Sequence, residues 1–506
     1  MRKKKSLYNI IASLLSYLTA MLFNFITQAL IVKVLGIEYS GVNGLFTNII
    51  TMLSVAELGL GTTIIYKLYE PVANNDVESI KSWMNFYKIC YRIVAIVVLF
   101  LGLAIIPLVP VIVGETNIHE NIILLYIISL MDTVLSYIMT YKRSLLYADQ
   151  KNYVINIIHI GYTAFMNITQ IAILYTFKNY IFFLAIKLVY RLLENVIINL
   201  YVDKNYPYIN DMAQKLPEKE KNDVISRIKA MFLQKISFVV NKGIDSITIS
   251  TIMGIATVGY YTNYNLIATT LASIVYQMMT GFMASIGNLM TEKNDEKNFS
   301  IFNKINIINV LLTAIAIVGF NCCIQSFINV WIGKEYLLSA GVVIAFDIWI
   351  YSDSIRRTMT MYKEAAGICR EDQFMYLIMA FINLISSIVL CKIIGISGVI
   401  LGTAISYLFL IFYSYPKYIF KPVFKKSKSV YYKITFRDIL YIVIATMLGG
   451  FLTYYVNFEN KILNFIVCAI ISIIVTIVTF SLYYSKNEHY KYLMNMLLSK
   501  IKQKKE

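Results

Sequence analysis

Fourteen apolar runs dominate this chain, and each is long enough to cross a lipid bilayer. A helix that spans the hydrocarbon core needs about 20 apolar residues. Backbone polar groups in lipid must be satisfied within the segment, so such runs form helices. The sequence therefore predicts an all-α polytopic membrane protein with about 14 transmembrane helices. The runs are residues 7–33, 42–69, 85–109, 121–147, 152–176, 180–202, 229–252, 261–290, 303–328, 337–361, 373–393, 396–416, 437–457 and 462–484.

The composition agrees with this fold class. Of 506 residues, 58% are hydrophobic and only 15% are charged, which is more apolar surface than a soluble protein can bury. The net charge of +17 would suggest nucleic acid in a soluble protein. In a membrane protein, Lys and Arg gather in cytoplasmic loops and face anionic lipid, so we expect membrane lipids rather than nucleic acid as partners.

The basic residues also predict the orientation in a bacterial cell membrane. With the N-terminus inside, outward segments hold five Lys, inward segments hold 35 Lys and Arg, and six lie within spans. This bias predicts cytoplasmic N- and C-termini. The basic start Met1-Arg-Lys-Lys-Lys5 precedes an apolar run without a typical cleavage site, so we expect a retained first span.

Six basic residues lie inside the apolar runs, where an unpaired cation costs several kcal/mol. Lys187, Arg191 and the acid Glu194 form one helical stripe, because they are spaced i, i+4 and i+7. A cavity lined by such cations would attract a large anion, and phosphate or pyrophosphate suits the donors of Lys and Arg. We expect the six bases to bind an anionic head group: Lys187, Arg191, Lys235, Lys242, Arg356 and Arg357.

Internal ion pairing is the alternative for these bases. Acids lie close in sequence to several of them, which allows three pairs: Arg191 with Glu194, Lys242 with Asp245, and Asp353 with Arg357. The sequence leaves each pair open.

Four intramembrane acids are candidates for coupling transport to a proton or to Na⁺, because a low-dielectric site favours a neutral or cation-bound carboxylate. These are Glu57, Asp132, Asp245 and Asp347. Glu57 and Asp132 lie in spans two and four, away from the basic spans six, seven and ten. A structural acid bonded to neighbouring helices is the alternative, and the coupling ion is left open.

The remaining chemistry points away from an enzyme. None of the six Cys forms a CxxC, and the three His share no neighbourhood, so we expect no metal and no bound cofactor. His159 alone lies in a span, without an evident partner, and is expected to be a core residue. A membrane polymerase usually needs a large outside loop and an acyltransferase a membrane-embedded His, so an integral-membrane polymerase or acyltransferase is a weaker alternative.

A faint internal repeat organises the chain. Leu35-Gly-Ile-Glu-Tyr-Ser-Gly41 and Met253-Gly-Ile-Ala-Thr-Val-Gly259 place glycines at the same offset of 218. Parallel repeats of six spans occur in transporters, with cargo bound where the halves meet. We therefore expect two six-helix lobes around a central cationic cavity, plus two extra helices: a lobe at 1–203, a cytoplasmic linker at 204–228, a second lobe at 229–422, and two spans with a basic tail at 423–506.

Three stretches resemble a known family. They are Leu35 to Phe46 with Ala56-Glu-Leu-Gly-Leu-Gly-Thr-Thr63 and Leu68-Tyr-Glu-Pro71, then Tyr147-Ala-Asp-Gln-Lys151, and finally Ala366-Gly367 with Asn383, Gly395 to Thr403 and Ser406. Their order is similar to that of the Wzx-type polysaccharide flippases of the multidrug/oligosaccharidyl-lipid/polysaccharide exporter superfamily. The resemblance covers the chain to about residue 425.

The resemblance implies a function. The expected cargo is an oligosaccharide repeat unit on a polyprenyl pyrophosphate carrier, moved to the outer leaflet by alternating access for O-antigen, capsule or exopolysaccharide synthesis. It also implies polysaccharide polymerase and glycosyltransferase partners, and an acid at Glu57. A cation-coupled multidrug exporter of the same superfamily is the alternative, although the six bases disfavour cationic drugs.

Overall fold

The computed structural model describes residues 2–57, 60–212, 215–292, 294–368 and 371–503. Some side chains within these ranges are not described, namely those of residues 2–7, 10, 55–56, 62–63, 227–236, 238–242, 497 and 500–503. The described backbone is helical with no strand, which confirms the all-α prediction. Contacts divide the chain into two compact units, Met1–Thr262 and Asn263–Glu506.

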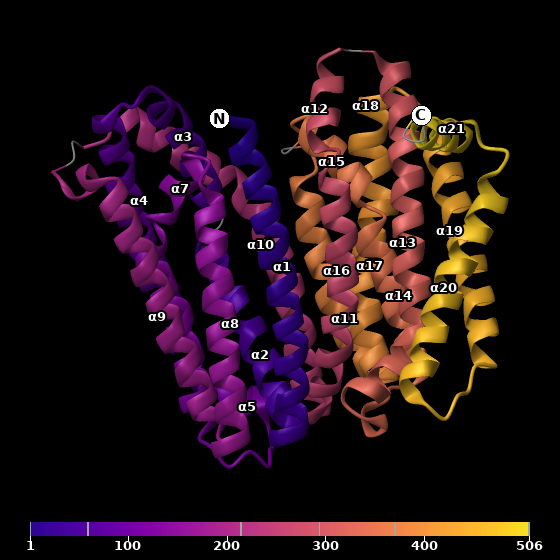
Figure 1. Cartoon of the computed structure of the whole chain (residues 1–506), viewed down its shortest axis with the longest axis horizontal. Helices are drawn as coiled ribbons and strands as arrows, with labels where there is room; N and C mark the ends of the chain where they lie inside the picture. The colour runs from indigo at the N-terminus through magenta and orange to yellow at the C-terminus, as the bar shows by residue number, and fades with distance from the viewer. Residues whose placement is uncertain (1, 58–59, 213–214, 293, 369–370, 504–506) are drawn as a thin grey trace. The chain divides into compact units, whose positions relative to one another are not determined.

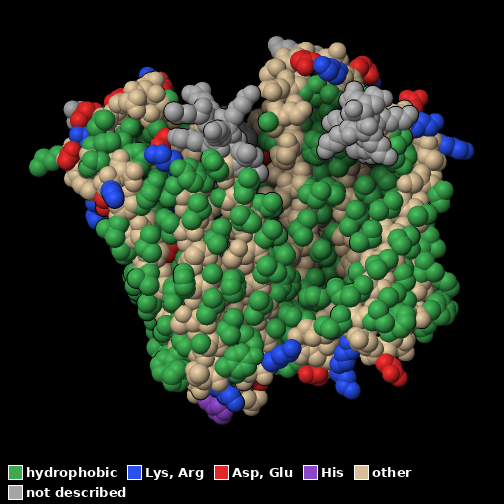
Figure 2. Space-filling model, viewed as in Figure 1, with side chains coloured by type: hydrophobic (Ala, Val, Ile, Leu, Met, Phe, Trp, Pro, Cys, Tyr) green, Lys and Arg blue, Asp and Glu red, His purple; other side chains and the backbone are tan. Residues whose placement is uncertain are grey.

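Among the residues described, ten stretches of helix are long and apolar enough to cross a membrane. Figure 2 shows hydrophobic side chains over the middle of the helices and charged ones gathered toward their ends. The other four predicted spans also fall on helices, but each is divided or charged. Residues 42–69 and 337–361 are split into shorter helices, and 180–202 and 229–252 carry Lys, Arg, Asp or Glu along their length.

The first unit contains ten helices and the start of an eleventh among the residues described. α8 lies between α1 and α9 and packs against both (Figure 1). α9 also packs against α6. The helices are α1 (Arg2–Leu30), α2 (Ile37–Leu53), α3 (Leu60–Asn74), α4 (Val77–Ile105), α5 (Val109–Val113), α6 (Ile122–Thr140), α7 (Arg143–Ala148), α8 (Asn152–Phe177), α9 (Tyr180–Asn205), α10 (Glu218–Met253) and the start of α11 (Ile255–Thr280).

Local sequence sets where these helices begin. Asp76 caps α4, because its side chain accepts hydrogen bonds from the backbone N–H of Ser79 at 3.1 Å and from its hydroxyl at 2.6 Å. These bonds hold the pKa of the Asp76 carboxyl below its ordinary value.

α10 begins at Glu218, inside the predicted linker, and packs on α2 within the first unit. The predicted lobe boundaries stay a prediction.

The two copies of the repeat meet within the first unit. Gly36 and Gly254 both have positive φ, 110° and 87°, and each lies directly before a helix, α2 or α11. A Cβ on Gly41 would overlap the carbonyl oxygen of Ile255, and a Cβ on Gly259 would overlap that of Ile37. The contact is reciprocal at the repeat offset, and only glycine permits such a close backbone approach.

The second unit is built around α13, which is more buried than the other candidate spans. α14, α19 and α20 pack against it, and α17 packs against α14 and α16. α21 lies across the ends of the long helices in Figure 1. The helices are α12 (Met283–Thr291), α13 (Asp295–Trp331), α14 (Ala340–Ser354), α15 (Arg357–Ala365), α16 (Gln373–Ile394), α17 (Ile396–Phe409), α18 (Lys421–Phe424), α19 (Lys428–Tyr454), α20 (Lys461–Tyr484) and α21 (Glu488–Gln503).

A buried amide donates a hydrogen bond to a backbone carbonyl that is left free where α14 ends and α15 begins. The Asn309 side chain on α13 donates to the carbonyl of Ile355 at 3.0 Å and approaches the Thr358 hydroxyl at 3.1 Å. Backbone groups freed by a helix break need such partners inside a membrane. The predicted continuous span at 337–361 is therefore wrong near its C-terminal end, where α14 ends and α15 begins.

Candidate substrate site

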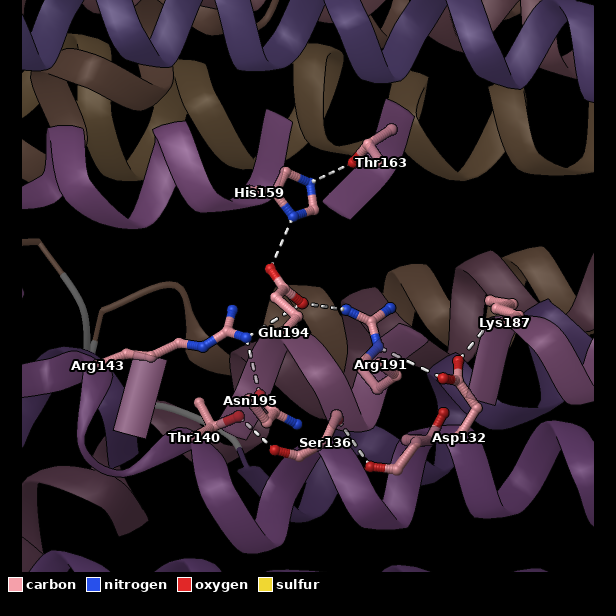
Figure 3. Close-up of polar contacts among 11 residues, drawn as sticks. Asp132, Ser136, Thr140, Arg143, His159, Thr163, Lys187, Arg191, Glu194 and Asn195 are labelled. Atoms are coloured by element: carbon pink, nitrogen blue, oxygen red, sulfur yellow. Dashed lines mark hydrogen bonds and ion pairs between the residues drawn. The ribbon is translucent and has the colours of Figure 1, made fainter. Parts of the chain in front are cut away.

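Charged side chains from four helices of the first unit meet around α9. The stripe predicted from spacing is present, and it faces α6 and α8 because both helices pack on α9. We call the group the α9 cluster; it comprises Asp132 on α6, Arg143 on α7, His159 on α8, and Lys187, Arg191 and Glu194 on α9 (Figure 3).

Glu194 is the buried centre of the α9 cluster. Its side chain has no solvent exposure and contacts three basic groups. Arg143 Nη2 and Arg191 Nη1 each lie 3.2 Å from Oε2, and His159 Nδ1 lies 2.9 Å from Oε1. A carboxylate removed from water is stable only when paired and hydrogen-bonded in this way. The predicted Arg191–Glu194 ion pair is confirmed.

Asp132 forms the second acidic position. Its Oδ2 lies 3.4 Å from Lys187 Nζ, and its Oδ1 lies 3.4 Å from Arg191 Nε (Figure 3). The expectation that Asp132 stands apart from the bases is therefore wrong, because α6 packs against α9 and brings the two together.

The cations of the α9 cluster are more accessible than the acids. The side chains of Lys187, Arg191 and Arg143 are 37%, 24% and 17% exposed, while those of Asp132 and Glu194 are 10% and 0% exposed. Three Lys and Arg side chains oppose two carboxylates, so the cations outnumber the acids in the cluster. The exposed part of the cluster therefore belongs more to the cations than to the acids.

Two members of the α9 cluster were missed from the sequence. His159 has a partner after all, Glu194, and its ring stacks on Tyr162 with centroids 5.5 Å apart, so the expectation of an unpartnered core residue is wrong. Arg143 lies at the start of α7 and donates to Asn195 at 2.8 Å. Arg143 was missed because it lies at the predicted cytoplasmic end of a span, where basic residues are common. The one sequence signal for these two residues was His159, a histidine within a span that had no evident role.

The other predicted bases do not join the α9 cluster within the described structure. Lys235 and Lys242 lie on α10, but their side chains are outside the described residues. Arg356 is buried, and its Nη2 lies 2.6 Å from Asp353 Oδ1. Arg357 pairs with the other oxygen of Asp353, which confirms that predicted pair, and its guanidinium lies 4.7 Å from the Tyr276 ring centre.

Two further predicted acids are buried in different surroundings. Asp347 on α14 accepts a hydrogen bond from the Asn321 amide at 2.6 Å, and its Oδ1 has no partner among the described residues. Asp245 on α10 accepts from the Tyr261 hydroxyl at 3.3 Å. Their role in ion coupling stays a prediction.

No group of three or more described His, Cys, Asp or Glu side chains could hold a metal ion.

Glu57 lies in a short 3₁₀ turn, Ser54–Glu57, after α2. The Tyr91 hydroxyl on α4 donates to Glu57 Oε1 at 2.6 Å, and the Tyr87 hydroxyl donates to that of Tyr91 at 3.0 Å. Among the described side chains, Glu57 thus accepts from a hydroxyl group, and its role in ion coupling stays a prediction.

We expect Glu57→Gln to weaken the dependence of transport on an imposed proton or Na⁺ gradient. The amide oxygen still accepts from Tyr91, but the amide cannot titrate or bind a cation as a carboxylate does. Transport into proteoliposomes with and without each gradient measures the change. Glu70→Gln, at an exposed position of α3, is the matched control. A gradient response equal to that of the unaltered protein would remove Glu57 as the coupling group.

These helices and their charged interior define a multi-span, all-helical membrane protein. No protein-family model and no curated protein matches the sequence. The fold is shared with the lipid II flippase MurJ in an inward-closed conformation, at 15% identity and a TM-score of 0.67, covering 94% of this chain and 99% of that one. It is shared with an inward-facing multidrug resistance MATE transporter of the MOP superfamily, at 13% identity and a TM-score of 0.61, over 77% and 91% of the chains.

A transporter of the MOP superfamily from Pyrococcus furiosus is also similar, at 16% identity and a TM-score of 0.53, over 80% and 92% of the chains. It is described as having a binding pocket of reversed polarity that suggests a different function. The fold predicted from the resemblance is thereby confirmed. The three solved structures named above are a flippase and two transporters, not enzymes.

Proposed function

We propose that this chain is a flippase for a lipid-linked oligosaccharide, joined to a polyprenyl carrier through pyrophosphate. It would move this cargo from the cytoplasmic to the outer leaflet of a bacterial cell membrane. The observation that carries the proposal is the α9 cluster, in which partly exposed cations lie over buried acids. The fold supports the class of activity, since a flippase and several transporters share it.

In this mechanism Lys187 and Arg191 bind the pyrophosphate, with Lys as a compact point charge and Arg as a forked donor. The polyprenyl tail stays in lipid while the head group passes by alternating access, and no covalent bond changes. Glu57, Asp245 and Asp347 are the candidates for coupling the cycle to a proton or Na⁺ gradient. Glycosyltransferases would supply the cargo and a polymerase would use it, for surface polysaccharide synthesis.

A multidrug exporter for cationic compounds fits the same fold but not the charge of this cluster. A cationic drug would meet Lys187 and Arg191 before either acid, and like charges repel. We therefore favour an anionic cargo.

Lys187→Gln is expected to weaken binding and flipping of a polyprenyl-pyrophosphate oligosaccharide by about ten- to a hundredfold. A hydrogen bond to a charged group contributes about 1.5–3 kcal/mol, and 1.4 kcal/mol is a tenfold change. Lys187 suits the test because it is 37% exposed and its one described contact is Asp132 at 3.4 Å. Flipping is measured in proteoliposomes by access of the head group to an impermeant reagent.

The matched control is Lys297→Gln. Lys297 is exposed and pairs with the exposed Glu292 outside the α9 cluster, so its loss should leave flipping unchanged. A second comparison uses the same oligosaccharide on an uncharged polyprenol. If Lys187→Gln flips the charged carrier at the normal rate, the proposed head-group site is rejected.

A further inference from the structure

The two acids of the α9 cluster hold their cations differently. Glu194 is fully enclosed, and its three basic contacts are 2.9–3.2 Å long. Asp132 is slightly exposed, and both of its contacts are 3.4 Å long. Charge-assisted hydrogen bonds between nitrogen and carboxylate oxygen are strongest at about 2.7–2.9 Å. The Asp132 contacts are therefore the weaker ones in the α9 cluster.

The weaker contacts belong to the cations that cargo would meet. Lys187 is the most exposed base of the α9 cluster, and Asp132 is its one described partner. Arg191 contacts both acids, with Nε toward Asp132 and Nη1 toward Glu194 (Figure 3). An anion could take the place of Asp132 at Lys187 and Arg191 while Arg191 keeps its contact with Glu194.

An empty carrier needs such a partner for its cations. After cargo leaves, Lys187 and Arg191 would otherwise return through the membrane without a counter-charge, which costs several kcal/mol. An alternating-access exporter repeats this return in every cycle of net transport. Exchange of one cargo molecule for another does not require the return of the empty state.

We propose that Asp132 is the internal substitute for the cargo's phosphate, an inference that rests on the proposed function. Asp132 pairs with Lys187 and Arg191 when the site is empty and yields them to pyrophosphate when cargo binds. Glu194 stays paired throughout and holds the arginines in position. Asp132 is thus a positioning residue that competes with cargo, and its carboxylate supports the return step.

Asp132→Asn tests this inference because the amide has nearly the same shape without the charge. Cargo should bind about two- to fivefold more tightly, the factor that one weak ion pair represents. Net flipping should fall by a similar factor or more, because the empty site returns slowly. Exchange between labelled and unlabelled cargo across the same proteoliposomes should stay within about twofold of the unaltered protein.

Two variants complete the design. Asp132→Glu keeps the charge, so net flipping and exchange should keep their normal ratio. Asp132→Ser is smaller and gives the same test if the amide variant is not recovered folded. Thermal unfolding checks that each variant is intact.

The outcomes separate the two hypotheses. If the unaltered protein does not flip the pyrophosphate-linked carrier, the proposed function fails and this inference with it. If it does, and Asp132→Asn loses cargo binding or lowers exchange and net flipping equally, Asp132 merely supports the structure and the inference is overturned. Unchanged binding and an unchanged ratio of net flipping to exchange overturn it as well.

Discussion

Replacing Glu194 with alanine is expected to destabilise the protein by about 3–5 kcal/mol, the usual loss when one member of a buried ion pair is removed. Glu194 has no solvent exposure and faces Arg143, Arg191 and His159. Without it, two guanidinium groups remain close together with only Asp132 to balance them. Transport should be lost together with stability, because Arg191 loses the contact that holds it toward the cargo.

Unfolding of the purified protein in detergent, followed by intrinsic fluorescence against temperature, measures the loss. Glu292→Ala is the control, since Glu292 is 48% exposed and pairs with Lys297 at the surface. Such exposed pairs contribute at most about 1 kcal/mol. Equal shifts in the two variants would contradict the view that Glu194 is the buried centre of the α9 cluster.

Gly41→Leu is the second substitution from which we expect a large effect. A Cβ at this position would overlap the Ile255 carbonyl oxygen, which belongs to the backbone and cannot turn away as a side chain could. Overpacking in a well-packed interior costs about 1–3 kcal/mol or more. The crossing between α2 and the start of α11 should open, with loss of both folded yield and transport.

Gly161→Leu on α8 is the matched control, because no heavy atom lies within 4 Å of its built Cβ. A helix interior favours leucine over glycine, so this variant should be neutral or slightly stabilising. The pair Gly41→Ala and Gly259→Ala adds a sharper test. Both methyl groups push the same two segments apart, so the double variant should cost less than the sum of the singles. Additive costs would mean that the two contacts are independent.

The length of the apolar runs predicted the membrane-spanning helices, and helical spacing predicted the residues that α9 contributes to the candidate site. Apolar runs in lipid must be helical, so a helix in each predicted span followed from the length of its apolar run, whereas short helices such as α18 and α21 were not predicted. The spacing of Lys187, Arg191 and Glu194 placed them together on α9, because helical neighbours are set by local geometry. The pairs Arg191–Glu194 and Asp353–Arg357 followed for the same reason.

Contacts between helices could not be predicted in this way. Asp132 and Arg191 are 59 residues apart, and His159 and Glu194 are 35 apart, so each contact depends on which helix faces which. Helix breaks were missed as well. The sequence around Ile355 holds no Gly or Pro that would mark a helix break, and the partner that satisfies its freed carbonyl is Asn309, on another helix.

The reciprocal contact of Gly41 with Ile255 and of Gly259 with Ile37 has a consequence for how the two halves of the chain can diverge. A side chain added at Gly41 would displace the backbone at Ile255, and one added at Gly259 would displace the backbone at Ile37. Neither glycine can therefore be replaced without moving the opposite stretch. The glycines that the two stretches share therefore lie where these stretches contact each other, and each shared glycine is required by the backbone of the opposite stretch.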